Sequence, residues 1–254
     1  MTNEDPLQEA LRLVGLADER GLKARLMGGL AFHAKAPEWT ARVSRGRRDI
    51  DLATRSRDRK ALQELLVEAG YLPDKQYNAL YGHKQLYFVD PTWNRPVDVL
   101  VDRLEMCHKF EFADRLGVDR PTLPAAELLL SKLQVVRINR KDVLDALILF
   151  AMHPLSEDDA GINVPRILEH TSNDWGWWRT VTENLEKARL FFEVELTPGE
   201  LDTTVPHRFD AAAQVAALKA RIDAAPKSTK WKLRARVGDR VAWYELPEEV
   251  GHDR

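Results

Sequence analysis

The chain of 254 residues contains a single cysteine, Cys107, and no long apolar run. One cysteine can form neither an intramolecular disulfide nor a cysteine-based zinc site, so the sequence predicts a cytoplasmic protein with a buried thiol. The N-terminal residues lack the basic and apolar regions of a secretory signal. The longest apolar helical segment, Val143 to Met152, is too short to span a bilayer, and we expect no membrane association.

The chain also has little excess of either charge, with 38 Lys and Arg against 40 Asp and Glu. The charges are unevenly distributed, however. Twelve basic residues and four acids lie between Arg20 and Lys60, and Lys227 to Arg240 holds six basic residues and one acid. Local fields of this kind attract anions even when the whole molecule is nearly neutral. A solvated face is the alternative interpretation for each run.

Hydrophobic periodicity predicts an α+β fold in two parts. Residues 1–122 are expected to combine helices with strands over 22–27, 49–53, 85–89 and 97–101. Residues 123–254 are expected to be mostly helical, including helices over 125–139 and 141–153. The alternation from Trp231 to Leu246, with a turn at Gly238-Asp239, predicts a terminal hairpin.

Gly28 and Gly29 stand at a predicted strand-to-helix junction. Two glycines allow the backbone to turn sharply and to approach a ligand closely, and the N-terminus of the following helix favours a phosphate. A glycine pair at a turn can also be only a turn, and the pair alone does not decide between these interpretations.

Three aspartates form the second candidate feature. Asp49 and Asp51 are two apart in a predicted strand, so both carboxylates project to the same side. Like charges held this close favour a cation, typically Mg²⁺ with its oxygen ligands. Ion pairing with Arg47 and Arg48 is the alternative. Asp98 lies in an otherwise apolar strand, where a carboxylate needs a partner, a ligand or a solvated sheet face. Asp102 also qualifies as the functional acid, although its place at the strand end is typical of a cap.

Taken in order, these residues resemble a known family. Leu26-Met27-Gly28-Gly29, Asp49-Ile50-Asp51-Leu52 and Val97-Asp98-Val99 resemble the nucleotidyltransferase superfamily related to DNA polymerase beta. Leu123 to Glu127, followed by Ser131-Lys132-Leu133, Arg137, Arg140-Lys141-Asp142 and Asp145, is similar to its AbiEii/MenT-like toxin branch. The spacing from Gly29 to Asp49 is longer than in compact members and implies an insertion over Glu38 to Arg48.

The resemblance implies an α+β fold, in which residues 1–122 form a nucleotidyltransferase-type mixed β-sheet with flanking helices, and a role for each matching residue. Gly28 and Gly29 would hold the nucleotide phosphates, together with Lys132. Asp49, Asp51 and Asp98 would bind a pair of Mg²⁺ ions, with Asp98 also acting as the base, and Asp142 would support the site. A solvated helix lysine is the alternative for Lys132.

The resemblance further implies a Mg²⁺-dependent enzyme that transfers NMP from an NTP to a hydroxyl. An RNA acceptor, such as a tRNA 3′ end, fits the toxin-like motifs and both basic runs. A small hydroxylated acceptor of the aminoglycoside type is an alternative, as is a non-catalytic nucleotide-binding protein or one that engages an antitoxin. Trp231, Trp243 and Tyr244, interleaved with the second basic run, are candidates for stacking on nucleobases or for packing on the helices.

Overall fold

The computed structural model describes residues 2–40, 48–191 and 208–246. Its central feature is a five-stranded sheet in the order β1-β2-β5-β4-β3. The strands are β1 (Ala24–Met27), β2 (Ile50–Thr54), β3 (Leu72–Pro73), β4 (Gln85–Asp90) and β5 (Arg95–Val101). β2 and β5 are parallel, whereas the other neighbouring pairs are antiparallel. The α+β class and the mixed sheet predicted from the sequence are therefore confirmed.

Helices surround the sheet and continue beyond it. The first part of the chain contributes α1 (Pro6–Glu19), α2 (Gly28–Lys35), α3 (Pro37–Thr40), α4 (Arg59–Glu68) and α5 (Lys75–Tyr81). The second part contributes α6 (Ala125–Leu133), α7 (Arg140–Met152), α8 (Val164–Asn173), α9 (Trp175–Leu190), α10 (Ala211–Ala224) and α11 (Thr229–Val237). Two short strand pairs lie outside the main sheet. They are β6 (Arg103–Glu105) with β7 (Lys109–Glu111), and β8 (Leu155–Ser156) with β9 (Ile162–Asn163).

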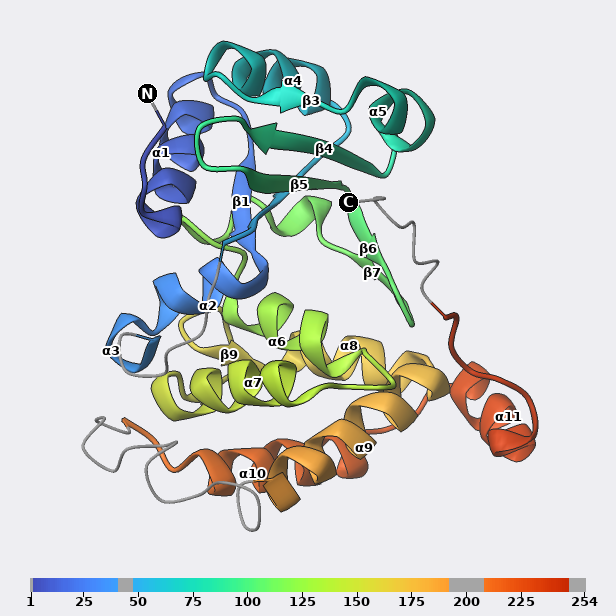
Figure 1. Cartoon of the computed structure of the whole chain (residues 1–254). Coiled ribbons are helices and arrows are strands. Elements are labelled where there is room, and N and C mark those ends of the chain that lie inside the picture. The colour runs from blue at the N-terminus through green and yellow to red at the C-terminus, as the bar shows by residue number, and fades with distance from the viewer. Residues whose placement is uncertain (1, 41–47, 192–207, 247–254) are drawn as a thin grey trace.

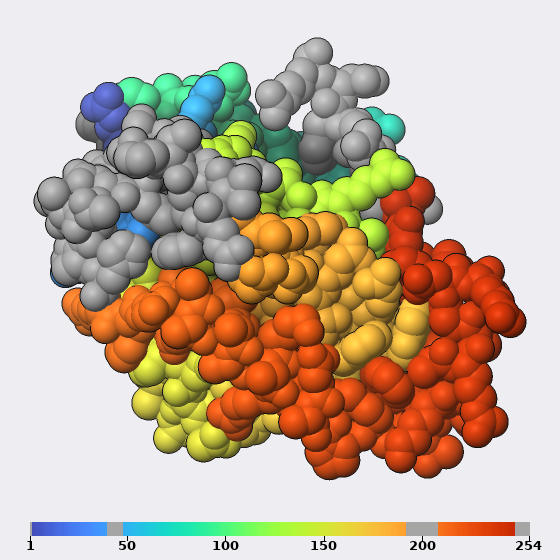
Figure 2. Space-filling model, turned by 90° about the horizontal axis from the view of Figure 1, so that it is seen from below, coloured from blue at the N-terminus to red at the C-terminus, as the bar shows by residue number. Residues whose placement is uncertain are grey.

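The arrangement has two levels (Figure 1). The sheet with α1, α4 and α5 forms the upper level, and α6 to α10 form the lower one, with α2 between them. A single cluster of buried apolar side chains extends through both, from Ala10 in α1 to Ile222 in α10. Seen from below (Figure 2), the orange and red C-terminal helices cover one face of the molecule. The division at residues 122 and 123 stays a prediction.

The strands around the site follow from alternation. In β5, Val97, Val99 and Val101 are buried, whereas Pro96, Asp98 and Leu100 are only half-buried on the opposite face. β4 and β5 pair as an antiparallel hairpin, as the turn-forming residues between Asp90 and Pro96 favour. Because successive side chains point to opposite faces, Asp98 lies on the less buried face of the sheet.

Some element boundaries differ from the sequence prediction. The helix expected over 125–139 ends at Leu133, and the next begins only at Arg140, with Asn139 as its N-cap. Asp49 lies one residue before β2 rather than within it. Most of the predicted insertion, residues 41–47, lies outside the described residues.

The predicted C-terminal hairpin is wrong. Thr229–Val237 is a helix, α11, and a 3₁₀ turn follows over Gly238–Arg240. The hydroxyl of Ser228 accepts a hydrogen bond from the Trp231 amide at 3.2 Å, which is a helix N-cap. The segment is rich in Lys, Arg, Leu and Ala, which favour helix. None of its residues is buried, so its apolar alternation does not define a strand face.

Candidate active site

Gly28 stands where β1 ends and α2 begins, as the sequence predicted. Its φ of 61° lies in the left-handed region, which favours glycine. A Cβ atom placed on Gly28 would lie 1.8 Å from Oδ2 of Asp51. The absence of a side chain therefore lets the Asp51 carboxylate reach the start of α2. Met27, at the N-cap, gives no side-chain hydrogen bond to this helix end.

Asp51 and Asp98 are register partners on the parallel strands β2 and β5. The structure thus brings together two of the three aspartates that the sequence singled out. Met27 is the partner of Asp51 on the other side, in β1. The carboxylates therefore lie on neighbouring strands beside the Gly28 turn. Asp49 is exposed, immediately before β2.

The pKa of Asp51 is shifted by its burial and by the neighbouring carboxylates. Burial raises the pKa of Asp51 to about 7, and the negative charges of Asp98 and Asp49 act in the same direction. Lys132 lowers it. A carboxylate that resists ionisation for these reasons is one that a bound cation would stabilise in its charged form.

Lys132 reaches this region from α6, and it is not the freely solvated helix lysine of the alternative interpretation. Its side chain is 15% exposed, and Nζ lies 2.6 Å from Oδ1 of Asp142 and 3.3 Å from Oδ2 of Asp145. Nζ also lies 5.5 Å from the centre of the Phe32 ring in α2. Asp142 thus restrains the position of Lys132, as a residue that supports the site would do.

Three residues beside Asp98 were missed in the sequence. Gln85 in β4 donates from Nε2 to Oδ1 of Asp98 at 2.5 Å. Tyr77 in α5 lies close enough for the Asp98 charge, after burial, to raise the pKa of its phenol. Tyr87 is the register partner of Asp98 and packs on Tyr77, with ring centres 6.2 Å apart. The pairing of β4 with β5 brings Gln85 and Tyr87 to Asp98, and the packing of α5 on β4 adds Tyr77.

The alternative acid, Asp102, has a structural task. It follows β5 with a φ of 63°, and its Oδ1 accepts a hydrogen bond from the Ser56 amide at 2.8 Å. This contact matches the cap that its place at the strand end predicted.

Several basic side chains between Arg20 and Lys60 are engaged in ion pairs and hydrogen bonds within the fold. Arg20 pairs with Glu68 at 2.6 Å, Arg55 with Asp58 at 2.6 Å, and the buried Arg25 with Asp18 at 3.0 Å. Lys35 pairs with Asp119. Arg48 and Arg59 donate to backbone carbonyls. Arg42, Arg45 and Arg47 lie outside the described residues.

Within the part of the chain that the structure describes, no group of three Asp, Glu, His or Cys side chains is assembled in a form that would hold a metal ion. The predicted triad of Asp49, Asp51 and Asp98 is therefore assembled only as the pair Asp51 and Asp98. Over the same residues, no helix has the length and apolarity needed to cross a membrane.

Comparisons with known proteins give the following. No protein-family model matches the sequence, and neither does any curated protein. Among solved structures, an antigenic nucleotidyltransferase-like protein from Paracoccidioides brasiliensis is 14% identical, with a TM-score of 0.44, over 84% of this chain and 98% of its own. The antibiotic-resistance factor ANT(2″)-Ia in solution is 16% identical, with a TM-score of 0.37, over 56% of this chain and 80% of its own.

A crystal structure of ANT(2″)-Ia in complex with adenylyl-2″-tobramycin is similar to the same extent, at 15% identity and a TM-score of 0.37. It covers 56% of this chain and 86% of its own. Likenesses of this strength do not assign the chain to a family. The function is therefore argued from the residues of the site itself.

Proposed function

We propose that this protein is a nucleotidyltransferase that transfers NMP from an NTP to a hydroxyl acceptor. One observation supports this above all others. Asp51 and Asp98 stand in register on neighbouring strands, and the Asp51 carboxylate reaches the start of α2 at a glycine that has no room for a side chain. A site that joins paired acids to a helix N-terminus suits a substrate with phosphates and a divalent cation.

The residues present suit Mg²⁺ in part. Their donors are carboxylate oxygens, which this hard cation prefers, and Mg²⁺ is usually bound by one or two carboxylates together with waters and substrate phosphates. Asp51 and Asp98 would hold it, with Asp49 as a further ligand when substrate is bound. When present, the ion supplies charge compensation for the oxygens around the reacting phosphorus.

The remaining roles fall to other residues of the chain. The first turn of α2, with Gly28 and Gly29, would bind phosphate oxygens through backbone N–H groups. Lys132, positioned by Asp142, would stabilise the negative charge of the departing pyrophosphate. The acceptor oxygen forms a bond to the α-phosphorus, and the bond from that phosphorus to the bridging oxygen of the β-phosphate breaks. The hydroxyl proton passes to the carboxylate of Asp98, which Gln85 orients.

Labelled NTPs provide the test. The protein is incubated with each α-labelled NTP, Mg²⁺ and either total tRNA or a set of aminoglycosides, and the labelled product is identified. Asp51→Asn and Asp98→Asn should each reduce incorporation by at least about a hundredfold, because they remove charge at the reacting centre. Asp102→Asn is the matched control, since an amide oxygen can still accept from Ser56, and it should keep most activity.

Incorporation that survives both substitutions would contradict the proposal. A labelled aminoglycoside would support NMP transfer with a small-molecule acceptor, and a labelled tRNA would support the RNA acceptor. A toxin role and an antitoxin partner rest on the sequence resemblance alone.

A further inference from the structure

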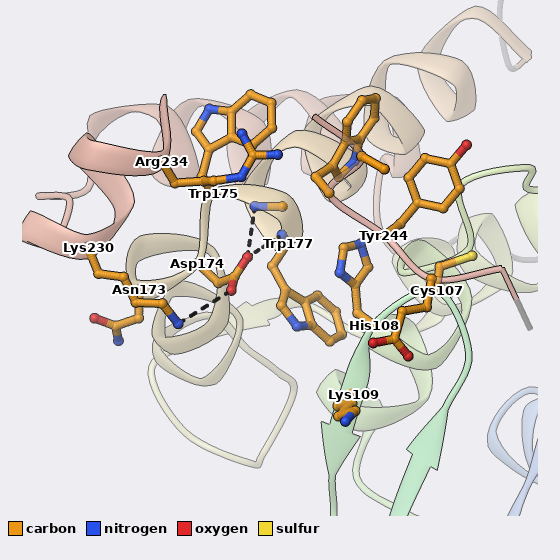
Figure 3. A pocket seen from close by; sticks show the side chains of 14 residues that line it. Cys107, His108, Lys109, Asn173, Asp174, Trp175, Trp177, Lys230, Arg234 and Tyr244 are labelled. Atoms are coloured by element: carbon orange, nitrogen blue, oxygen red, sulfur yellow. Dashed lines mark hydrogen bonds and ion pairs between the residues drawn. The ribbon is translucent and has the colours of Figure 1, made fainter. Parts of the chain in front are cut away.

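A cavity lies where the N-terminus of α9, the turn between β6 and β7, and the C-terminal segment, residues 242–245, meet (Figure 3); none of the three aspartates lines it. Its volume is about 560 Å³, within the range of small-ligand pockets. In Figure 3, Arg234 and Trp175 lie on one side and His108 and Tyr244 on the other, with Asp174 and Trp177 between them.

The floor of this pocket is aromatic and firmly held. The rings of His108 and Trp177 are 5.0 Å apart. His108 Nε2 lies 2.9 Å from Oγ1 of Thr180, and Trp243 Nε1 donates to the same oxygen at 3.0 Å. Burial lowers the pKa of His108 to about 4, so the ring is neutral at physiological pH. The C-terminal segment is tied to the β6–β7 turn by the Glu245 amide, which donates to the Cys107 carbonyl at 3.1 Å.

One wall is formed by α11. The guanidinium of Arg234 lies 4.7 Å from the centre of the Trp175 ring and donates to the carbonyls of Gly238 and Val241, both at 2.7 Å. The carboxylate of Asp174 accepts from the Gly176 and Trp177 amides, at 2.8 and 3.1 Å, and so caps α9. The aromatic walls therefore stay in place without a ligand.

The rim of the pocket is positively charged and exposed. Lys109, at the start of β7, is exposed, and the side chain of Lys230 is 81% exposed, 3.8 Å from Asp174. With Arg234, these cations outnumber the two acids of the lining, Asp174 and Glu245. A rim of mobile lysines around flat aromatic surfaces suits a ligand that has an aromatic ring and flanking negative charge.

We propose that this pocket binds one unpaired nucleotide of an RNA acceptor, whose base packs against Trp243 and Tyr244 and whose phosphates lie near Lys109 and Lys230. Sequence-tolerant binding of single strands combines aromatic stacking with a basic path for the backbone. A paired base cannot enter, because in a duplex its faces are stacked on its neighbours.

The position of the pocket relative to the proposed active site fits an extended acceptor. β6 begins at Arg103, directly after the strand that carries Asp98, and the β6–β7 hairpin runs from there to the pocket (Figure 1). An RNA seated in the pocket would therefore lie at the far end of the hairpin that follows the strand of Asp98, with β6 beginning five residues after Asp98. The inference rests on the proposed function in that it names RNA as the acceptor.

Binding without NTP tests the inference apart from catalysis. The probe is a fluorescein-labelled single-stranded RNA of about twelve nucleotides, within the range of single-strand site sizes. Fluorescence anisotropy gives its Kd at several salt concentrations. Lys109→Gln with Lys230→Gln should raise Kd about tenfold at low salt and reduce the salt slope by about one to two. The double variant Lys232→Gln with Arg236→Gln removes two exposed charges of α11 that do not line the pocket, and should change Kd far less.

Stacking is tested separately from charge. Tyr244→Ala should raise Kd about tenfold and leave the slope of log Kd against log salt concentration unchanged. Tyr244→Phe should bind as the unsubstituted protein does, because a phenyl ring still stacks. The same RNA annealed to its complement should bind more weakly than the single strand. Circular dichroism confirms that each variant is folded.

Equal Kd values for the pocket and control variants would overturn the inference, as would equal binding of duplex, or no binding of RNA. None of these results would affect NMP transfer to a small acceptor. Conversely, RNA binding that depends on the pocket, in a protein whose NTP incorporation is unaffected by Asp51→Asn, would contradict the proposed function and leave the pocket assigned.

Discussion

Gly28 and Asp51 constrain each other, and their contact can be separated from backbone strain. Gly28→Ala would introduce both a positive φ for an L side chain and a Cβ atom 1.8 Å from the Asp51 carboxylate. Gly21→Ala introduces only the first, because Gly21 has a φ of 70° and nothing within 4 Å of its Cβ position. Gly21→Ala is therefore the matched control.

We expect Gly21→Ala to cost about 1–2 kcal/mol of unfolding free energy and to leave activity intact. Gly28→Ala should cost more and lower NTP incorporation at least about tenfold, because the carboxylate must move. Urea unfolding and labelled-NTP assays measure the two effects. Equal consequences of both substitutions would show that Asp51 does not need this close approach.

Gln85 is a positioning residue whose role can be tested through Asp98. Because Gln85 Nε2 donates to Oδ1 of Asp98 at 2.5 Å, Gln85→Ala should lower kcat by roughly 10- to 100-fold, as is typical of partners that orient a ligand or base. KM for the NTP should change little. Gln76→Ala, an exposed glutamine of α5, is the control.

Gln85→Glu tests the positioning role through the pH–rate profile, which a purely structural role would leave unchanged. A second carboxylate beside Asp98 disfavours ionisation of the pair, so the acidic limb of the pH–rate profile should shift to higher pH. A profile that keeps its position in this variant would argue against the assignment.

Among the elements, α6 is fastened to its neighbours by a buried carboxylate. Glu127 is fully buried, and its Oε1 lies 2.8 Å from Arg115 Nε and 3.1 Å from Arg166 Nε. Arg166, in α8, also donates to the Glu111 carbonyl of β7 at 3.0 Å. This network therefore joins the helical part to the β6–β7 hairpin.

Glu127→Gln should lower the unfolding free energy by about 1–3 kcal/mol, because two cations lose their shared buried counterion while Arg115 keeps Asp159 and Arg166 keeps Glu169. The control is Glu186→Gln in α9, whose partly exposed pair with Arg189 should change the unfolding free energy far less. Urea midpoints with an unchanged m-value measure both. A loss below 1 kcal/mol for Glu127→Gln would show that the network does not hold these elements together.

The elements that could be predicted from the sequence are those with strong local signals. Asp5-Pro6 predicts the start of α1, and the Asp5 carboxylate indeed accepts from the Leu7 and Gln8 amides. The apolar alternation of 97–101 predicts β5, and Gly28 predicts a tight strand-to-helix turn. Each of these depends on a few consecutive residues.

Features that depend on partners could not be predicted in this way. The alternation at 231–246 resembles a strand, but it has no sheet face to bury, and the Ser228 cap and helix-forming residues prevail. Gln85 becomes a neighbour of Asp98 only through the register of β4 on β5. The C-terminal pocket likewise requires segments that are far apart in the sequence.

At the scale of the whole molecule, the net charge is near neutral, but the two basic runs differ in how many of their side chains are paired. Much of the described part of the first run is held in ion pairs and backbone contacts, including the buried Arg25. The second run leaves Lys230, Lys232 and Arg236 exposed on α11. Among the described residues, attraction for an anionic acceptor is therefore expected from α11 more than from residues 20–40 and 48–60.

The stability of the whole molecule should report the ionisation of Asp51. Burial raises its pKa from 3.8 to about 7, so this carboxyl keeps a proton in the folded state at pH values where the unfolded chain has lost it. Its contribution to unfolding free energy therefore falls as pH rises from about 4 to about 7, by at most about 4 kcal/mol. Asp51→Asn removes that fall.

The difference in Tm between Asp51→Asn and the unsubstituted protein reports the titration of Asp51 and of the charges coupled to it, because the more distant groups titrate alike in both. It should be near zero at about pH 4 and reach several degrees in favour of Asn at about pH 8. Mg²⁺ should raise the Tm of the unsubstituted protein at the higher pH, because cation binding favours the ionised carboxylates, and EDTA should reverse it. Asp51→Asn should show little of this response, whereas Asp102→Asn should keep it. A Mg²⁺ response of equal size in both variants would place the cation elsewhere than at Asp51.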